Sequence, residues 1–183
     1  MFEYVITQQS LKHLAQTVYE FCGMDYTSNL MTFEMKITRR LKTLQLSSID
    51  EYMRLLESSR REMDVLVEVI TINETYFFRE ERQLHVYEQK LLPELQRKKK
   101  GTINVWSAAC STGDEPYSLV MALSKHVPLN QIKILATDLD KQVIAKAKVG
   151  LYNEKSIMNV PDEMKKKYFT QIGPTYKIAD EIK

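Results

Sequence analysis

A run of small side chains followed by two acids, within Ile103 to Ser118 (INVWSAACSTGDEPYS), is the stretch of this sequence best suited to bind a ligand. Its apolar and β-branched start indicates a buried strand, and Gly113 followed by Pro116 indicates a tight turn and a helix start. Small residues let a ligand approach the backbone there, beside the positive end of the helix. Because the glycine fingerprint is incomplete, the stretch predicts either a nucleotide-type site or an ordinary strand-to-helix loop.

Asp138 is a second candidate binding residue. It follows Gly113 by 25 residues and ends a second apolar stretch, Ile132 to Ala136. In dinucleotide-binding folds an acid about 20 residues beyond the turn accepts hydrogen bonds from ribose hydroxyls. Asp138 could instead cap the next helix, but Asp140 is equally placed to do so. We therefore favour ribose binding for Asp138.

The charge of the turn argues against a phosphate ligand. Asp114 and Glu115 occupy positions where a phosphate site would carry glycines or a lysine, and two carboxylates suit a cation. S-adenosylmethionine combines ribose hydroxyls with cationic sulfonium and amino groups. We therefore expect a methyl donor at this turn rather than a dinucleotide.

The composition is that of a globular protein. The 183 residues can form one domain or two small ones, and 44% are hydrophobic and 27% charged. Without a membrane-spanning run or a signal segment, we expect a cytoplasmic protein that does not insert into membranes. The two cysteines, far apart, predict no metal site and no disulfide. The basic run Arg97 to Lys100 is interpreted as a solvated helix end, so we expect no nucleic-acid partner.

Residues 1–70 predict an all-helical domain. Apolar residues recur at helical spacing in four segments, and Thr7 and Ser48 are placed to cap two of them. The second helix is expected from about Asn29 to Thr43. Outside its apolar face it carries four basic residues: Lys36, Arg39, Arg40 and Lys42.

Residues 71–100 predict an interdomain segment and a linking helix, with apolar positions at Leu84, Tyr87, Leu91, Leu92 and Leu95. Residues 101–183 then alternate strands and helices, which predicts a doubly wound parallel sheet that binds its ligand beyond the carboxyl ends of the strands. Thr175 to Ile178 would start a further parallel strand. The expected fold class is α plus α/β: a helical bundle followed by an incomplete Rossmann-like domain.

Four motifs, in order, resemble the chemotaxis receptor methyltransferases, the CheR family. They are NETYFFRE (73–80), WSAACSTGDEPYS (106–118), ATDLD (136–140) and AKAKVGLY (145–152). The resemblance covers essentially the whole chain. It implies transfer of a methyl group from S-adenosylmethionine to glutamate side chains in the cytoplasmic helical domains of membrane chemoreceptors, with S-adenosylhomocysteine as the product.

Carried over to this sequence, the family's cofactor contacts would fall on Asn73, Thr75, Arg79, Glu115 and Asp138. Glu115 would face the methionine amino group and Asp138 the ribose. Arg79 is also the expected catalytic residue, because it could pair a carboxylate of the cofactor or of the incoming glutamate. The alternative for Arg79 is an intrahelical pair with Gln83 or with an acid nearby.

The reaction requires alignment and a water-poor site rather than a general base, since a glutamate carboxylate is already ionised at neutral pH. Lys36, Arg39, Arg40 and Lys42 could hold an acidic receptor helix, or they could form a solvated face. Phe77 and Phe78 are expected to pack between the two domains.

The chain departs from the family pattern by stopping at Lys183. The resemblance places a small antiparallel subdomain and further strands beyond that point. We therefore expect a fragment of a longer methyltransferase, rather than a naturally short relative, with weak cofactor binding and little turnover. Its two-stranded sheet should expose apolar faces. The alternative function is a non-catalytic receptor-binding module that has lost the active site.

Overall fold

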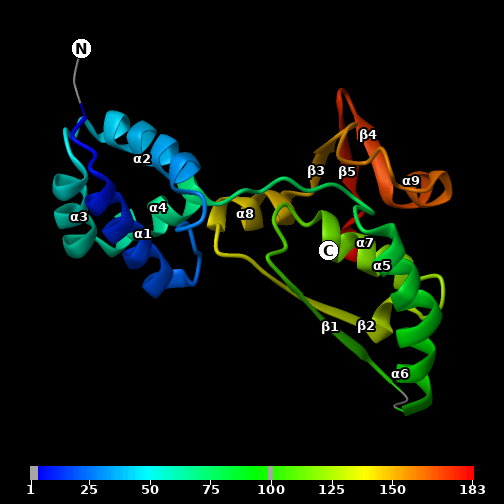
Figure 1. Ribbon diagram of the computed structural model, residues 1–183. Coiled ribbons are helices and arrows are strands. Elements are labelled where there is room, and N and C mark those ends of the chain that lie inside the picture. The colour runs from blue at the N-terminus through cyan, green and yellow to red at the C-terminus, as the bar shows by residue number, and fades with distance from the viewer. Residues whose placement is uncertain (1–3, 99–100) are drawn as a thin grey trace. The chain divides into compact units, whose positions relative to one another are not determined.

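A computed structural model describes residues 4–98 and 101–183 and divides the chain into two compact units, Met1–Ile72 and Asn73–Lys183 (Figure 1). Within these residues no helix combines the length and the apolar character that crossing a membrane requires.

The first unit is a helical bundle, as predicted. Its helices are α1 (Gln8–Cys22), α2 (Leu30–Leu44), α3 (Ile49–Ser58) and α4 (Arg60–Ile70). Thr7 caps α1 and Ser48 caps α3 through side-chain oxygens, which satisfy backbone amides that have no partner inside the helix. The inward residues form one core, which includes Leu14, Val18, Phe33, Ile37, Leu41, Ile49, Tyr52, Leu66 and Ile70.

The second unit contains the predicted strand–helix–strand–helix order. Its elements are β1 (Ile103–Ala108), α7 (Asp114–Leu123), the 3₁₀ turn η2 (Leu129–Gln131), β2 (Ile132–Thr137) and α8 (Lys141–Val149). β1 and β2 pair in parallel, from Ile103 opposite Ile132 to Ala108 opposite Thr137. The carboxyl ends of both strands therefore meet at one edge, where the sequence predicts the ligand.

One face of this parallel pair is uncovered among the described residues. Trp106 and Leu135 lie opposite each other in the register and are 68% and 63% exposed. Val105 and Ile134, which face the other way, pack against the core of this unit. Parallel sheets are usually covered on both faces, and the predicted exposure of an apolar face is confirmed.

The linking helix is interrupted by a π-helical turn. It comprises α5 (Glu81–Val86), η1 (Tyr87–Leu91) and α6 (Leu92–Lys98). Only Leu84 and Leu92 of its five predicted apolar positions are buried, while the other three are exposed. Arg97 of the basic run is exposed, and Lys99 and Lys100 lie outside the described residues.

Residues 151–178 form a small antiparallel sheet, which corrects two expectations. Its strands β3 (Leu151–Asn153), β4 (Phe169–Ile172) and β5 (Thr175–Ile178) have the order β3-β5-β4, and α9 (Asp162–Tyr168) precedes β4. Thr175 to Ile178 therefore pairs antiparallel and does not extend the parallel sheet. The second corrected expectation is that the antiparallel subdomain lies beyond Lys183, because three antiparallel strands come before that residue. The 3₁₀ turn η3 (Asp180–Ile182) follows them.

Phe77 and Phe78 are buried in the core of the second unit, so the expectation that they pack between domains is wrong. The Phe77 ring meets the rings of Tyr152 and Phe169 edge to face, with centroids 4.7 and 5.2 Å apart. Such pairs stabilise an aromatic cluster beyond their buried area. The segment that contains Asn73 and Arg79 is thereby anchored on the second unit.

Candidate functional site

The loop between β1 and α7 has an unusual backbone. Ala109, Ser111 and Gly113 all have positive φ angles of 60°, 47° and 90°. A Cβ on Gly113 would lie 2.9 Å from both Ala147 Cβ and Tyr117 Cε2, so only glycine fits there. Because Ala109 is small and exposed, a ligand can approach the backbone at the strand end.

The Asp138 carboxylate fixes this loop to the end of β2. Its Oδ2 accepts a hydrogen bond from the Ser111 amide at 2.7 Å, and its Oδ1 accepts one from the Asp140 amide at 2.9 Å. Asp140 is the residue that caps α8. The alternative of Asp138 as the helix cap is therefore wrong, and a second lone pair on each of its oxygens is suited to a hydroxyl donor.

Asn73 lies beside the same strand ends. Its Nδ2 donates to Asp140 Oδ2 at 2.7 Å, and its carbonyl oxygen accepts a hydrogen bond from Ser111 Oγ at 3.1 Å. The structure thus brings Asn73 and Asp138, 65 residues apart in the chain, into one hydrogen-bond network through Ser111 and Asp140.

Glu115 is exposed on the first turn of α7. Its Oε1 accepts a hydrogen bond from Ser107 Oγ at 2.6 Å, which ties the carboxylate to β1. Burial raises the pKa of the Cys110 thiol, and the negative charges of Asp138 and Glu115 raise it further.

Asp114 does not face a ligand, contrary to the expectation that both acids of the turn offer their charge. It is fully buried, and its Oδ2 accepts a hydrogen bond from Thr112 Oγ1 at 2.5 Å. Its Oδ1 has no hydrogen-bond partner among the described residues. Burial raises the pKa of this carboxyl. Of the two acids, Glu115 alone is exposed.

Arg79 and Thr75 belong to the segment that precedes α5. Arg79 is exposed, its Nη1 donates to the Glu74 carbonyl at 3.0 Å, and its Nε lies 4.0 Å from Glu80 Oε1. Both partners are close in sequence, and Glu80 agrees with the acid nearby that the alternative for Arg79 named. Within the described residues the recorded contacts of Arg79 do not include Glu115 or Asp138. Thr75 is half-buried.

Sequence reasoning placed Asp140 as a possible helix cap but missed the hydrogen bonds by which Ser107, Ser111 and Asp140 contact Glu115, Asp138 and Asn73. Each is buried and binds a predicted site residue or its neighbour. A polar residue in a buried strand or strand-end loop is the signal that could have identified them, because buried polar groups need partners.

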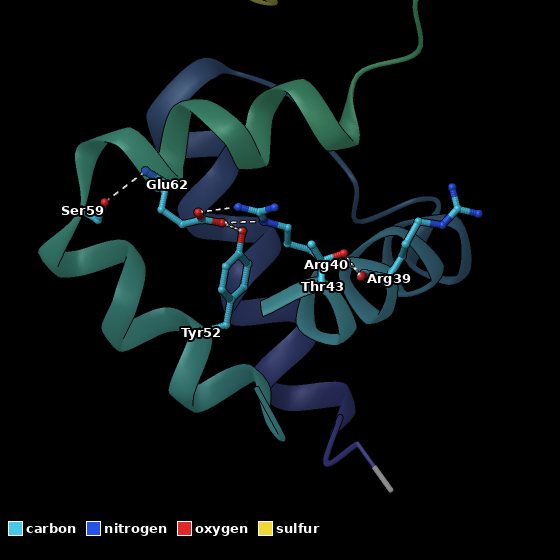
Figure 2. A network of polar contacts seen from close by, with 6 residues as sticks. All are labelled: Arg39, Arg40, Thr43, Tyr52, Ser59 and Glu62. Atoms are coloured by element: carbon cyan, nitrogen blue, oxygen red, sulfur yellow. Dashed lines mark hydrogen bonds and ion pairs between the residues drawn. The ribbon is translucent and has the colours of Figure 1, made fainter. Parts of the chain in front are cut away.

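Two of the four basic residues on α2 are held by partners inside the first unit. Arg40 Nε donates to Glu62 Oε1 at 2.8 Å, and Arg40 Nη2 donates to Glu62 Oε2 at 2.6 Å (Figure 2). The Tyr52 hydroxyl donates to Glu62 Oε1 at 2.9 Å. Lys36 Nζ donates to the carbonyls of Ile70 and Thr71 at the end of α4.

Arg39 and Lys42 are the exposed pair of this set. In Figure 2 the Arg39 side chain points away from the Arg40–Glu62–Tyr52 network. The predicted basic surface of α2 is therefore narrower than the sequence indicated, because of the four cations of this helix only Arg39 and Lys42 are exposed.

Two family models cover most of the chain. Residues 9–71 match the model described as "CheR methyltransferase, all-alpha domain", and residues 73–183 match "CheR methyltransferase, SAM binding domain". The chain belongs to the CheR methyltransferase family. The resemblance inferred from the four motifs is confirmed, as is the fold of a helical domain followed by part of a Rossmann-like CheR domain.

Relatives in the CheR family are similar along most of this chain. The chemotaxis protein methyltransferase of Borreliella burgdorferi is 34% identical over 91% of this chain and 63% of its own length. Chemotaxis protein methyltransferase 2 of Vibrio cholerae is 32% identical over 100% of this chain and 66% of its own. The Escherichia coli protein is 30% identical over 92% and 59%. The chain thus spans less than two thirds of each of these relatives.

Proposed function

We propose that the second unit binds S-adenosylmethionine beyond the carboxyl ends of β1 and β2. We further propose that the chain belongs to an enzyme that methylates glutamate side chains in the cytoplasmic helical domains of membrane chemoreceptors. The observation that carries this is that hydrogen bonds hold both carboxylates at the ends of the parallel strands, inside the segment matched by the SAM binding domain model: Asp138 accepts from the Ser111 amide, and Glu115 accepts from Ser107 Oγ of β1.

The carboxylate oxygens at the strand ends suit this cofactor. Glu115 is exposed, and its Oε1 is oriented by Ser107, so the carboxylate is available to the cationic amino group of the methionine part. Asp138 retains acceptor capacity on both oxygens for ribose hydroxyls. The loop has no lysine, and its exposed acid would repel a phosphate. Thr75 would add a polar group from the preceding segment.

When bound, S-adenosylmethionine would supply a methyl group carried on a positively charged sulfur. An oxygen of the ionised receptor glutamate would bond to the methyl carbon as the carbon–sulfur bond breaks, which would give the methyl ester and neutral S-adenosylhomocysteine. The chain's residues have only to hold the two reactants in line and exclude water. In this proposal Arg79 is the catalytic residue. Its exposed guanidinium would exchange the Glu74 carbonyl for a carboxylate of the cofactor or of the incoming glutamate, with a gain from charge-assisted hydrogen bonds.

The receptor surface in this proposal is the exposed side of α2. Arg39 and Lys42 supply the positive charge that attracts a glutamate-rich helix, while Lys36 and Arg40 keep α2 folded on its neighbours. Electrostatic attraction of this kind mainly steers association and register rather than adding large affinity.

Calorimetric titration with S-adenosylhomocysteine tests the cofactor site. Asp138→Asn and Glu115→Gln should each weaken binding about tenfold or more, because each removes a charged acceptor. Glu154→Gln, at an exposed position after β3, is the matched control and should leave the affinity unchanged. Equal affinities in all four proteins would contradict the proposed site.

Transfer itself is tested by incubating the chain with tritiated S-adenosylmethionine and receptor-bearing membranes. Methyl incorporation that is lost in Arg79→Ala supports the enzyme. Capture of receptor without incorporation supports the second candidate, a non-catalytic receptor-binding module, which the internal contacts of Arg79 favour.

A further inference from the structure

Asp140 is 4% exposed, and both of its carboxylate oxygens accept hydrogen bonds from the protein itself. Oδ1 accepts from the amides of Gln142 and Val143 at 2.8 and 3.3 Å, which caps α8. Oδ2 accepts from Asn73 Nδ2 at 2.7 Å. Because an ionised carboxylate only accepts, the Asn73 amide must present its nitrogen to Asp140.

Four hydrogen bonds close a ring through three segments of the second unit. Asn73 Nδ2 donates to Asp140 Oδ2, and the Asp140 amide donates to Asp138 Oδ1. The Ser111 amide donates to Asp138 Oδ2, and Ser111 Oγ donates to the Asn73 carbonyl oxygen. The ring joins the segment before α5, the β1–α7 loop and the β2–α8 loop.

The ring sets the orientation of the Asp138 carboxylate. Each Asp138 oxygen is held by one backbone amide, and both amides belong to residues that Asn73 contacts. Ser111 keeps a left-handed φ of 47°, a conformation that costs a non-glycine residue energy and persists where surrounding contacts determine it. Loss of the Asn73–Asp140 bond would therefore release a strained loop as well as the carboxylate.

We propose that Asn73 and Asp140 are a pair of positioning residues for cofactor binding. Their hydrogen bond holds Asp138 in the orientation that accepts ribose hydroxyls, and the Asn73 side chain acts through Asp140 rather than by contacting the cofactor. This inference rests on the proposed function. It assigns a role to Asp140 and changes the role expected for Asn73.

An exchange of the two side chains tests the pair. Asn73→Asp places two carboxylates within hydrogen-bond distance, and their repulsion should weaken S-adenosylhomocysteine binding about tenfold. The affinity is measured at pH 8, because at lower pH the two carboxylates could share a proton and keep a hydrogen bond. The double variant Asn73→Asp with Asp140→Asn restores one donor facing one acceptor, and asparagine still caps α8. Its affinity should return to within about threefold of the parent chain.

The control for added charge is Asn104→Asp, at an exposed position on β1, which should not change the affinity. If the Asn73 amide contacted the cofactor directly, the double variant would bind as weakly as Asn73→Asp, and this result would overturn the inference. Unchanged affinity in Asn73→Asp, with or without a lower melting temperature, would also overturn it.

Hydrogen exchange of the Ser111 and Asp140 amides provides a readout that needs no cofactor. Both amides donate to Asp138, so their protection should fall in Asn73→Asp and return in the double variant. This exchange pattern supports the positioning role whether or not the parent chain binds S-adenosylhomocysteine. Absence of binding by the parent chain would contradict the proposed function but not the Asn73–Asp140 pair. Protection that does not follow the exchange of side chains overturns the inference.

Discussion

Glu62 accepts two hydrogen bonds from the guanidinium of Arg40, and their side chains are only 10% and 16% exposed. The two residues lie on α4 and α2, and the Tyr52 hydroxyl of α3 donates to the same carboxylate. Burial raises the pKa of Tyr52, and so does its hydrogen bond to Glu62, which keeps this hydroxyl a donor. One buried carboxylate thus joins three helices of the first unit.

Arg40→Ala should lower the free energy of unfolding of the first unit by about 2–3 kcal/mol, since it leaves the Glu62 charge largely buried without its partner. Arg39→Ala, at the neighbouring exposed arginine, should change it by less than about 0.5 kcal/mol. Urea denaturation followed by circular dichroism measures both. Equal effects of the two variants would show that the buried pair does not stabilise the bundle.

Receptor binding should depend on the other two cations. Charge reversal of Arg39 and Lys42 together should raise the dissociation constant for receptor-bearing membranes about three- to tenfold, with the larger effect at low salt. The affinity for S-adenosylhomocysteine should stay the same. Reversal of Arg40 is unsuitable for this test, because the variant would lose its ion pair. An unchanged receptor affinity would favour the solvated-face interpretation of α2.

Gly113 should tolerate no side chain. Gly113→Ala adds a Cβ only 2.9 Å from Ala147 and Tyr117 at a φ of 90°, so it should cost more than about 2 kcal/mol of stability and weaken cofactor binding. Gly173→Ala is the matched control, because its φ is also positive, at 57°, but nothing lies within 4 Å of the added Cβ. It should cost about 1 kcal/mol. Similar losses in both variants would mean that space at Gly113 is not limiting.

The local signals in the sequence predicted the elements well. Thr7 and Ser48 mark helix starts because caps act within a few residues, and the apolar spacing of α1 to α4 reports directly which face is buried. The strand–turn–helix at Gly113 and the position of Asp138 directly after β2 were predictable for the same reason. Each depends on residues that are neighbours in the chain.

Partners distant in the chain were not predictable. Arg40 and Glu62 are 22 residues apart, and Asn73 and Asp140 are 67 apart. Nothing near Arg40 distinguishes it from Arg39, which is exposed. The antiparallel pairing of β5 likewise depends on β3 and β4, since four residues of strand pattern do not specify direction. Burial of Asp114 follows from the packing around the loop rather than from its position beside Glu115.

Asp114 should make stability depend on pH in an unusual direction. Burial raises its pKa above the ordinary value of 3.8 and outweighs the hydrogen bond from Thr112, which lowers it. The folded chain therefore holds this proton to higher pH than the unfolded chain does. The stability linked to Asp114 is fully present below 3.8 and is lost as the pH rises through the folded pKa.

Asp114→Asn removes this titration while keeping the shape of the side chain. The free energy of unfolding of the parent chain, minus that of the variant, should fall as the pH rises from about 4 to about 8. Asp180→Asn is the control, because a hydrogen bond from Lys183 lowers the pKa of the exposed Asp180 below 3.8, so its contribution is lost only at lower pH and the difference for this variant should change little across the range. Urea denaturation across this range separates the two. A difference for Asp114→Asn that rises with pH would mean that the buried carboxyl is ionised. The positive end of α7 would then stabilise its charge, or a group would bind Oδ1, which has no hydrogen-bond partner among the described residues.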